Sequence, residues 1–153
     1  MYSCGLRISE AVSLEIGAID SANLQLRIIG KGDRERRVPL PQPALEDLRS
    51  LWKTHRNPRW LFPVHSGSGP ANAQVLRRTF QEAAREAGVT RRVTPHALRH
   101  SYATRLLENG VDTRVVQILL GHVHIATTAI YAHLTEPTRI SIRGVLDKLM
   151  TGL

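Results

Sequence analysis

The sequence has a single cysteine, Cys4, among its 153 residues. One cysteine excludes an internal disulfide, a four-cysteine zinc site and a CxxC redox pair, and it suits a reducing compartment such as the cytoplasm. The chain also lacks any apolar run of about 18 residues. Its first residues, MYSCGLRISEA, contain no apolar stretch with a small-residue cleavage site. The sequence therefore predicts neither a membrane span nor an export signal.

Acidic residues are scarce: 13 Asp and Glu stand against 21 Lys and Arg, which gives a formal net charge of +8. The basic residues recur along the whole chain, and this distribution predicts a basic surface for a polyanion, with nucleic acid as the leading partner class. Many basic proteins bind no nucleic acid, so charge alone leaves both possibilities open. At this length, with 42% hydrophobic residues, the chain is expected to form one domain with its own core.

The apolar pattern of the first third predicts a short helix and a β-hairpin. From Ser9 to about Leu14, apolar residues recur at helical intervals. Two segments with alternating apolar residues follow over residues 24–28 and 36–40, separated by the turn residues KGD. They predict two antiparallel strands joined by a hairpin that carries Lys31 at its tip.

The rest of the chain is predicted to contain one more strand and several helices. The strand, over residues 59–64, is expected at a sheet edge or at a strand end, because Pro63 has no backbone N–H to donate. Periodic segments with capping and stop residues predict helices over residues 43–55, 73–88, 94–109, 112–121 and 138–150. The predicted fold class is mainly α with a small antiparallel β-sheet (α+β). The last helix is expected to cover the chain's own core or to pack into a neighbouring protomer.

Two basic side chains are predicted near the start of one helix. His96 falls in its first turn and Arg99 lies one turn further on, so both are expected on one side near the positive end of the helix, where a phosphate is favoured. Leu98, Tyr102 and Leu106 form a different stripe that is expected to pack inward and to leave His96 and Arg99 free. The alternative is a cap-region histidine and a solvated arginine.

Further candidates follow in the last third of the chain. His122 comes directly after Gly121, the expected helix stop, where a loop can direct its imidazole toward a ligand. Tyr131 is expected on a polar helix side, with its hydroxyl accessible. A metal site of His122, His124 and His133 is disfavoured, because these residues match no HExxH or CxxC pattern and no carboxylate lies among them.

Taken together, these residues resemble the tyrosine recombinase (integrase) family, in its Xer and phage integrase branch. The resemblance lies in the order and spacing of five motifs: GLRISEA with Arg7, GKGDRERRVPL with Lys31, HALRH with His96 and Arg99, LLGH with His122, and TTAIYAH with Tyr131. It implies the helical catalytic-domain fold with a small antiparallel sheet over residues 1–153. It also implies that the N-terminal DNA-binding domain and the leading helix of typical members are absent from this chain.

The resemblance implies an enzyme for site-specific DNA recombination. Tyr131 would attack a DNA phosphodiester, forming a 3′-phosphotyrosine link and releasing a 5′-hydroxyl. Arg7, Arg99 and His122 would bind the phosphate, since guanidinium groups present paired N–H donors to its oxygens. Because these cations supply the charge stabilisation that phosphoryl transfer needs, neither a metal nor another cofactor is expected.

Three residues carry assignments with alternatives. His96 is the candidate base for the tyrosine proton, and the resemblance nominates Lys31 as the acid for the leaving oxygen. Lys31 would look the same as a plain phosphate contact. Glu10, three residues after Arg7, either holds the Arg7 guanidinium in place or forms only a surface ion pair with it.

The expected partners are double-stranded DNA and, by resemblance, further recombinase protomers in a tetrameric assembly, with no membrane. Two other functions stay open at this point. One is a non-catalytic DNA-binding fragment or regulator, in which residues 96–122 form a helix-turn-helix with Gly110 in the turn. The other, a type IB topoisomerase, would use the same chemistry, but the short chain and the LLGH motif look more like recombinases.

Overall fold

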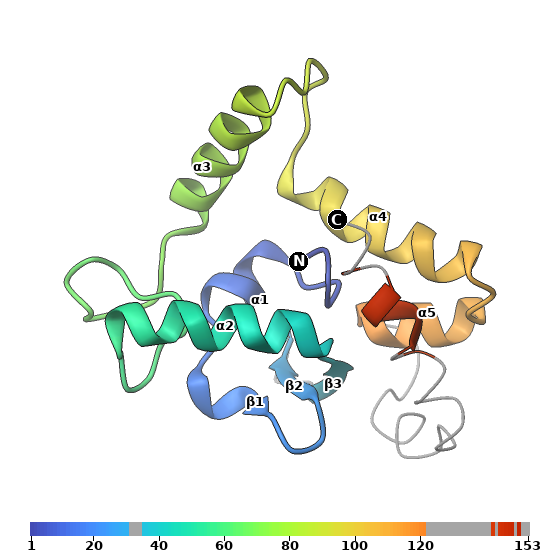
Figure 1. The fold of residues 1–153 in the computed structure, drawn as a ribbon, viewed down its shortest axis with the longest axis horizontal. Helices are drawn as coiled ribbons and strands as arrows, with labels where there is room; N and C mark the ends of the chain where they lie inside the picture. The colour runs from blue at the N-terminus through green and yellow to red at the C-terminus, as the bar shows by residue number, and fades with distance from the viewer. Residues whose placement is uncertain (31–34, 122–141, 143, 149, 151–153) are drawn as a thin grey trace.

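The computed structural model describes residues 1–30, 35–121, 142, 144–148 and 150. Figure 1 shows the order of its elements: α1 (Ile8–Val12), the 3-10 helix η1 (Ile16–Ala18), β1 (Ile19–Asp20), β2 (Gln25–Ile29), β3 (Glu35–Pro39), α2 (Gln42–His55), α3 (Ala73–Glu86), α4 (Pro95–Glu108) and α5 (Thr113–Leu120). Residues 142, 144–148 and 150 are also helical. Within these described segments, no helix combines the length and the apolar character that a bilayer crossing requires.

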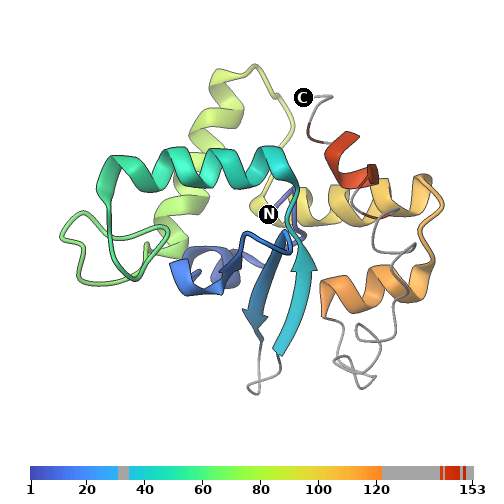
Figure 2. The same cartoon turned by 60° about the horizontal axis from the view of Figure 1, so that its bottom comes forward.

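The three strands form one antiparallel sheet in the order β1-β2-β3. Leu26 on β2 stands opposite Val38 on β3, and Ile28 stands opposite Arg36. All four side chains are buried, whereas Arg37 is exposed, so one face of the sheet packs inward and carries an arginine among its apolar residues. Figure 2 shows β2 and β3 side by side beneath α2.

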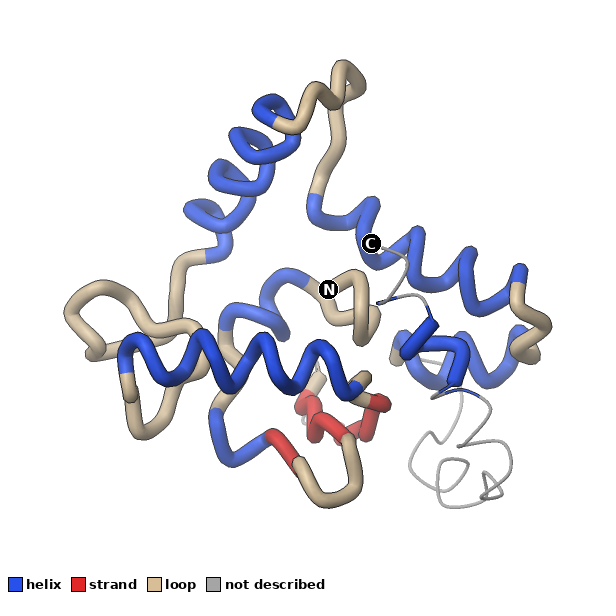
Figure 3. The backbone as a smooth tube through the Cα atoms, in the orientation of Figure 1, coloured by secondary structure: helices blue, strands red, loops and turns tan. Residues whose placement is uncertain are grey.

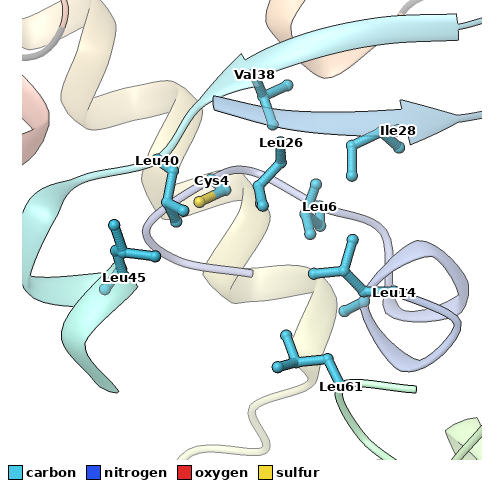
Figure 4. Close-up of a cluster of buried hydrophobic side chains, with 11 residues drawn as sticks. Cys4, Leu6, Leu14, Leu26, Ile28, Val38, Leu40, Leu45 and Leu61 are labelled. Atoms are coloured by element: carbon cyan, nitrogen blue, oxygen red, sulfur yellow. The ribbon is translucent and has the colours of Figure 1, made fainter. Parts of the chain in front are cut away.

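A first hydrophobic core joins the sheet to α1, α2 and the loop after α2. Figure 4 shows most of its members, which are Cys4, Leu6, Ala11, Leu14, Leu26, Ile28, Val38, Leu40, Ala44, Leu45 and Leu61. Fully burying a leucine or valine side chain stabilises a fold by roughly 1.5–3 kcal/mol. Leu6 before α1 and Leu14 after it both belong to this core, so their burial holds the short helix against the sheet.

A second core lies between α4, α5 and the C-terminal helical residues. Its members are Tyr102, Leu106, Val116, Ile118, Leu119, Leu120, Ile142 and Leu146. The predicted tail helix thus covers the chain's own core with Ile142 and Leu146. Asp112 caps α5 by accepting from Arg114 N at 2.8 Å, and Gly121 ends it with φ +66°, as the sequence predicts.

Helix α3 differs from the others because none of its residues is buried. In Figures 1 and 3 it projects away from the sheet and from the α4–α5 pair. Val75 is 62% exposed and Leu76 is 37% exposed, while the helix also carries Arg77, Arg78 and Arg85.

The predicted fold class is confirmed, and so are the hairpin and the helices before Gly121, with small shifts of their ends. The prediction of a strand over residues 59–64 is wrong. The sheet takes its additional strand from β1 instead. Trp60 and Pro63 make only isolated bridges, to Glu15 and Pro70 respectively. A proline cannot donate to a strand ladder, and this segment is occupied by bends between single bridges.

Candidate active site

Arg7 is the N-cap residue of α1 and has an extended backbone conformation. Its backbone N–H donates to Glu10 Oε2 at 2.7 Å, and its Nη1 donates to Glu10 Oε1 at 3.0 Å. A third contact reaches across the fold, from Arg7 Nη2 to the carbonyl oxygen of Gly121 at 3.3 Å. The Arg7 side chain nevertheless stays 40% exposed, so part of its guanidinium remains accessible to a ligand.

Glu10 lies between two arginines. The Nη1 and Nη2 atoms of Arg36 donate to the same two carboxylate oxygens that Arg7 contacts, at 2.9 and 2.8 Å. Burial raises the pKa of Glu10, but hydrogen bonds from Arg36 and Arg7 outweigh it and lower the pKa to about 2. The Glu10 side chain is only 7% exposed, so the surface ion pair considered for it is wrong, and the predicted contact with Arg7 is confirmed.

Arg99 on α4 is buried and engaged, which corrects the prediction that it is free. It is 4% exposed, and its Nη1 and Nη2 donate to the carbonyl oxygens of Gly5 and Leu120, both at 2.5 Å. The segment before α1 and the end of α5 cover this side of α4, and helical spacing alone did not reveal that. Burial, with a smaller contribution from the charge of Arg7, lowers the pKa of Arg99 to about 10, so the guanidinium stays protonated at neutral pH.

The approach of Gly5 to α4 depends on its lack of a side chain. Gly5 has φ +61°, and a Cβ added there would lie 2.6 Å from the ring of Tyr102. Only glycine fits this position without displacing the fully buried ring. Gly5 therefore permits the contact through which its carbonyl oxygen holds Arg99.

The three arginines converge on the end of α5. Their guanidinium groups donate to three successive carbonyl oxygens, those of residues 119, 120 and 121, from Arg36, Arg99 and Arg7 in that order. The last carbonyls of a helix lack intrahelical partners and carry partial negative charge, which cations offset. We call Arg7, Arg36 and Arg99 the arginine cluster; it lies at the residues that directly precede His122 in the chain.

The other candidate residues lie apart from this cluster or fall outside the residues that the structure describes. His96 is exposed in the first turn of α4, as predicted, but it does not share the environment of the buried Arg99. Lys31, His122 and Tyr131 lie outside the described residues, and so do the other histidines of the disfavoured metal site. Among the six candidate residues, the structure thus brings Arg7 and Arg99 together.

Arg36 belongs to this cluster although it is not among the candidate residues predicted from the sequence. In the segment RERRVPL it shares the inward phase of Val38 and Leu40, whereas Arg37 takes the outward phase. An arginine in the inward phase of a strand predicts a buried charge that needs acceptors. This signal was present in the sequence.

Comparison with known proteins identifies the family. The Phage integrase family matches residues 1–137. The chain belongs to the phage integrase family. Two relatives of this phage integrase chain are named tyrosine recombinase XerD. The protein of Lacticaseibacillus casei is 42% identical over 149 residues, covering 93% of this chain and 50% of that protein. The protein of Rhizobium meliloti (strain 1021) is 42% identical over 141 residues, covering 89% and 45% respectively.

Solved structures of tyrosine recombinases share the fold of this phage integrase chain. XerA recombinase is 31% identical with a TM-score of 0.71, covering 91% of this chain and 52% of that one. The integrase of mycobacterium phage Brujita is 28% identical with a TM-score of 0.75, covering 97% and 48% respectively. XerH bound to its difH substrate is 28% identical with a TM-score of 0.72, covering 92% and 43% respectively. The predicted family and fold are confirmed, and the chain spans about half the length of the relatives it matches.

Proposed function

We propose that residues 1–153 form a tyrosine recombinase catalytic domain that cleaves and rejoins DNA strands through a 3′-phosphotyrosine at Tyr131. The observation that carries this proposal is the convergence of Arg7 and Arg99 on the end of α5, directly before His122, in a phage integrase chain. The proposed reaction is site-specific DNA recombination, as the names of the XerD relatives indicate for those proteins.

The arginine cluster suits a phosphate. Arg7 is partly exposed, and its guanidinium has donors beyond the two that Glu10 and Gly121 accept. Each Nη of Arg99 carries two N–H groups, of which the carbonyl contacts use one each. The unused donors are the ones that we assign to the non-bridging oxygens. Removing one such preorganised donor typically costs about 10²- to 10³-fold in rate.

The proposed covalent step exchanges one phosphorus–oxygen bond for another. The Tyr131 oxygen bonds to phosphorus while the bond from phosphorus to the 5′ oxygen of the next nucleotide breaks. His96, which is exposed at the start of α4, takes the phenolic proton, and Lys31, in the connection between β2 and β3, supplies a proton to the departing oxygen. His122 donates a further hydrogen bond to the phosphate. Attack of the 5′-hydroxyl on the phosphotyrosine reverses the step.

A second basic surface provides contacts for the DNA backbone. Its arginines are exposed on α3 and in the loop that follows: Arg77, Arg78, Arg85, Arg91 and Arg92. The last three line one hollow together with Gly88 and Thr90. With a net charge of +8, such a surface favours double-stranded DNA without regard to sequence. We further propose assembly with other recombinase protomers on DNA, in the cytoplasm.

The test is the capture of the covalent intermediate. The protein is incubated with a pool of duplexes that carry a nick beside randomised sequence, so that a cleaved strand is lost and the adduct accumulates. Denaturing electrophoresis then separates protein joined to DNA, and mass spectrometry locates the linked residue. We expect an adduct at Tyr131 that Tyr131→Phe abolishes. DNA binding without any adduct would instead support the non-catalytic DNA-binding regulator.

A further inference from the structure

We infer that Arg36 is a positioning residue of the proposed active site, which holds the same Glu10 carboxylate that Arg7 contacts and fixes both residues to the end of α5. This inference rests on the proposed function and extends it to a residue that the five motifs do not assign. Arg36 acts through its neighbours, since all three nitrogens of its guanidinium group already donate within the fold.

Each nitrogen of the Arg36 guanidinium donates a hydrogen bond within the fold. Nη1 and Nη2 donate to the two Glu10 oxygens, and Nε donates to the carbonyl oxygen of Leu119 at 3.1 Å. The Arg36 side chain is 5% exposed, against 40% for Arg7. The two arginines that contact Glu10 thus differ in exposure. Arg36 holds the carboxylate inside the fold, whereas the Arg7 side chain is partly exposed to solvent.

The contacts of Arg36 require the planar guanidinium group. Its paired donors match both oxygens of one carboxylate, and its third nitrogen points elsewhere, to α5. The backbone of Gly121 lies against the same group, because a Cβ added at Gly121 would be 3.2 Å from Nη1 and from Cδ of Arg36. A lysine ammonium at this position would keep the charge, but it cannot contact the two carboxylate oxygens in parallel and Leu119 as well.

Loss of these contacts should affect the chemical step more than DNA affinity. Without Arg36, the Glu10 carboxylate is free to rotate, so Arg7 loses its fixed orientation. The end of α5, which leads directly into His122, loses one of its three arginine contacts. Misplacing a group in an active site by about 1 Å costs on the order of 100-fold in rate. The phosphate contacts on α3 and its loop are unaffected, so DNA binding should persist.

The experiment compares Arg36→Lys and Arg36→Ala with the matched control Arg37→Ala. Arg37 is the next residue on the same strand, but its side chain is 58% exposed. Single-turnover adduct formation at saturating nicked DNA gives the rate of the chemical step, and a binding titration with Tyr131→Phe in each background gives Kd. For Arg36→Lys we expect a rate lower by about 10- to 100-fold, with Kd changed less than about twofold. For Arg37→Ala we expect the rate at saturation and Kd both to stay unchanged.

Arg36→Lys decides the outcome, because Arg36→Ala leaves a buried carboxylate with one partner fewer and is prone to unfold. An unchanged rate in folded Arg36→Lys overturns the inference. Equal losses of rate and affinity also overturn it, since they indicate general damage to the fold.

A second measurement needs no activity. The guanidinium ¹⁵N signals of Arg7, assigned with Arg7→Lys, should show restricted rotation in the unmodified protein and averaging in Arg36→Lys. Unchanged Arg7 signals overturn the inference. If the unmodified protein forms no adduct on any DNA, the proposed function fails, while this measurement still decides whether Arg36 orders Arg7.

Discussion

Arg36 and Glu10 form a bidentate ion pair inside the fold, with N–O distances of 2.8 and 2.9 Å and side chains that are 5% and 7% exposed. The same carboxylate accepts two further hydrogen bonds from Arg7, through its backbone N–H and its Nη1. Four donors therefore converge on one carboxylate. Glu10 is the residue through which β3, the start of α1 and the exposed guanidinium of Arg7 are coupled.

Replacing Glu10 with glutamine should destabilise the protein strongly. The amide has one acceptor oxygen in place of two, and the positive charges of Arg7 and Arg36 then lack their counter-ion. Breaking a buried pair by removing one partner costs roughly 3–5 kcal/mol, which denaturant unfolding of Glu10→Gln measures directly. The control is Glu82→Gln, since Glu82 pairs with Arg78 at 3.2 Å on the exposed face of α3. The control should lose less than about 1 kcal/mol. Equal losses in both variants would contradict the role assigned to burial.

Stability should depend on pH through Glu10 in a defined window. Its pKa falls from an ordinary 4.5 to about 2 in the folded protein. Between these values the unfolded state binds more protons, so the free energy of unfolding rises with pH. The stabilisation is complete above pH 4.5 and is lost as pH falls through 2, by about 3 kcal/mol in total. Subtracting the pH profile of Glu10→Gln from that of the unmodified protein isolates this contribution. A flat difference between pH 2 and 5 would disprove it.

The sequence predicts which elements and residues form this site better than it predicts the contacts between them. Alternation and helical periodicity place the hairpin and α4, because each pattern reflects which side of one element is buried. Arg99 shows the limit: its helix was predicted, but the two carbonyl oxygens that it contacts come from residues 5 and 120, far away in the chain. No local pattern encodes such contacts. The strand expected over residues 59–64 failed for a related reason, since a strand needs a partner that local alternation does not supply.

Arg99→Lys should damage both the fold and the proposed reaction. A lysine has one ammonium nitrogen in place of the two fixed nitrogens that join Gly5 to Leu120, so the hydrogen bonds to these buried carbonyls are weakened or lost, at a cost of about 1–3 kcal/mol. Adduct formation should fall by about 100-fold or more, because the remaining charge cannot present paired donors to a phosphate. Arg105→Lys is the matched control, since Arg105 lies on the same helix with a side chain that is 58% exposed. Comparable losses in the two variants would remove Arg99 from the site.

Alanine substitutions at Gly88 and Gly121 distinguish the cost of backbone strain from the cost of disturbing the arginine cluster. Gly121 and Gly88 both follow helices and have φ values of +66° and +74°. A Cβ at Gly88 would meet nothing within 4 Å, whereas a Cβ at Gly121 would meet three atoms of Arg36 at 3.2–3.3 Å. Gly88→Ala should therefore cost about 1 kcal/mol from the left-handed conformation alone. Gly121→Ala should cost more in denaturant unfolding, because the methyl group displaces the Arg36 guanidinium from Glu10 and Leu119. It should also slow adduct formation at saturating DNA, a rate that does not depend on DNA affinity and that Gly88→Ala should leave unchanged. Equal destabilisation by the two variants would mean that the end of α5 accommodates the methyl group without moving Arg36. The contact of Arg36 with this helix end would then contribute little to holding Glu10.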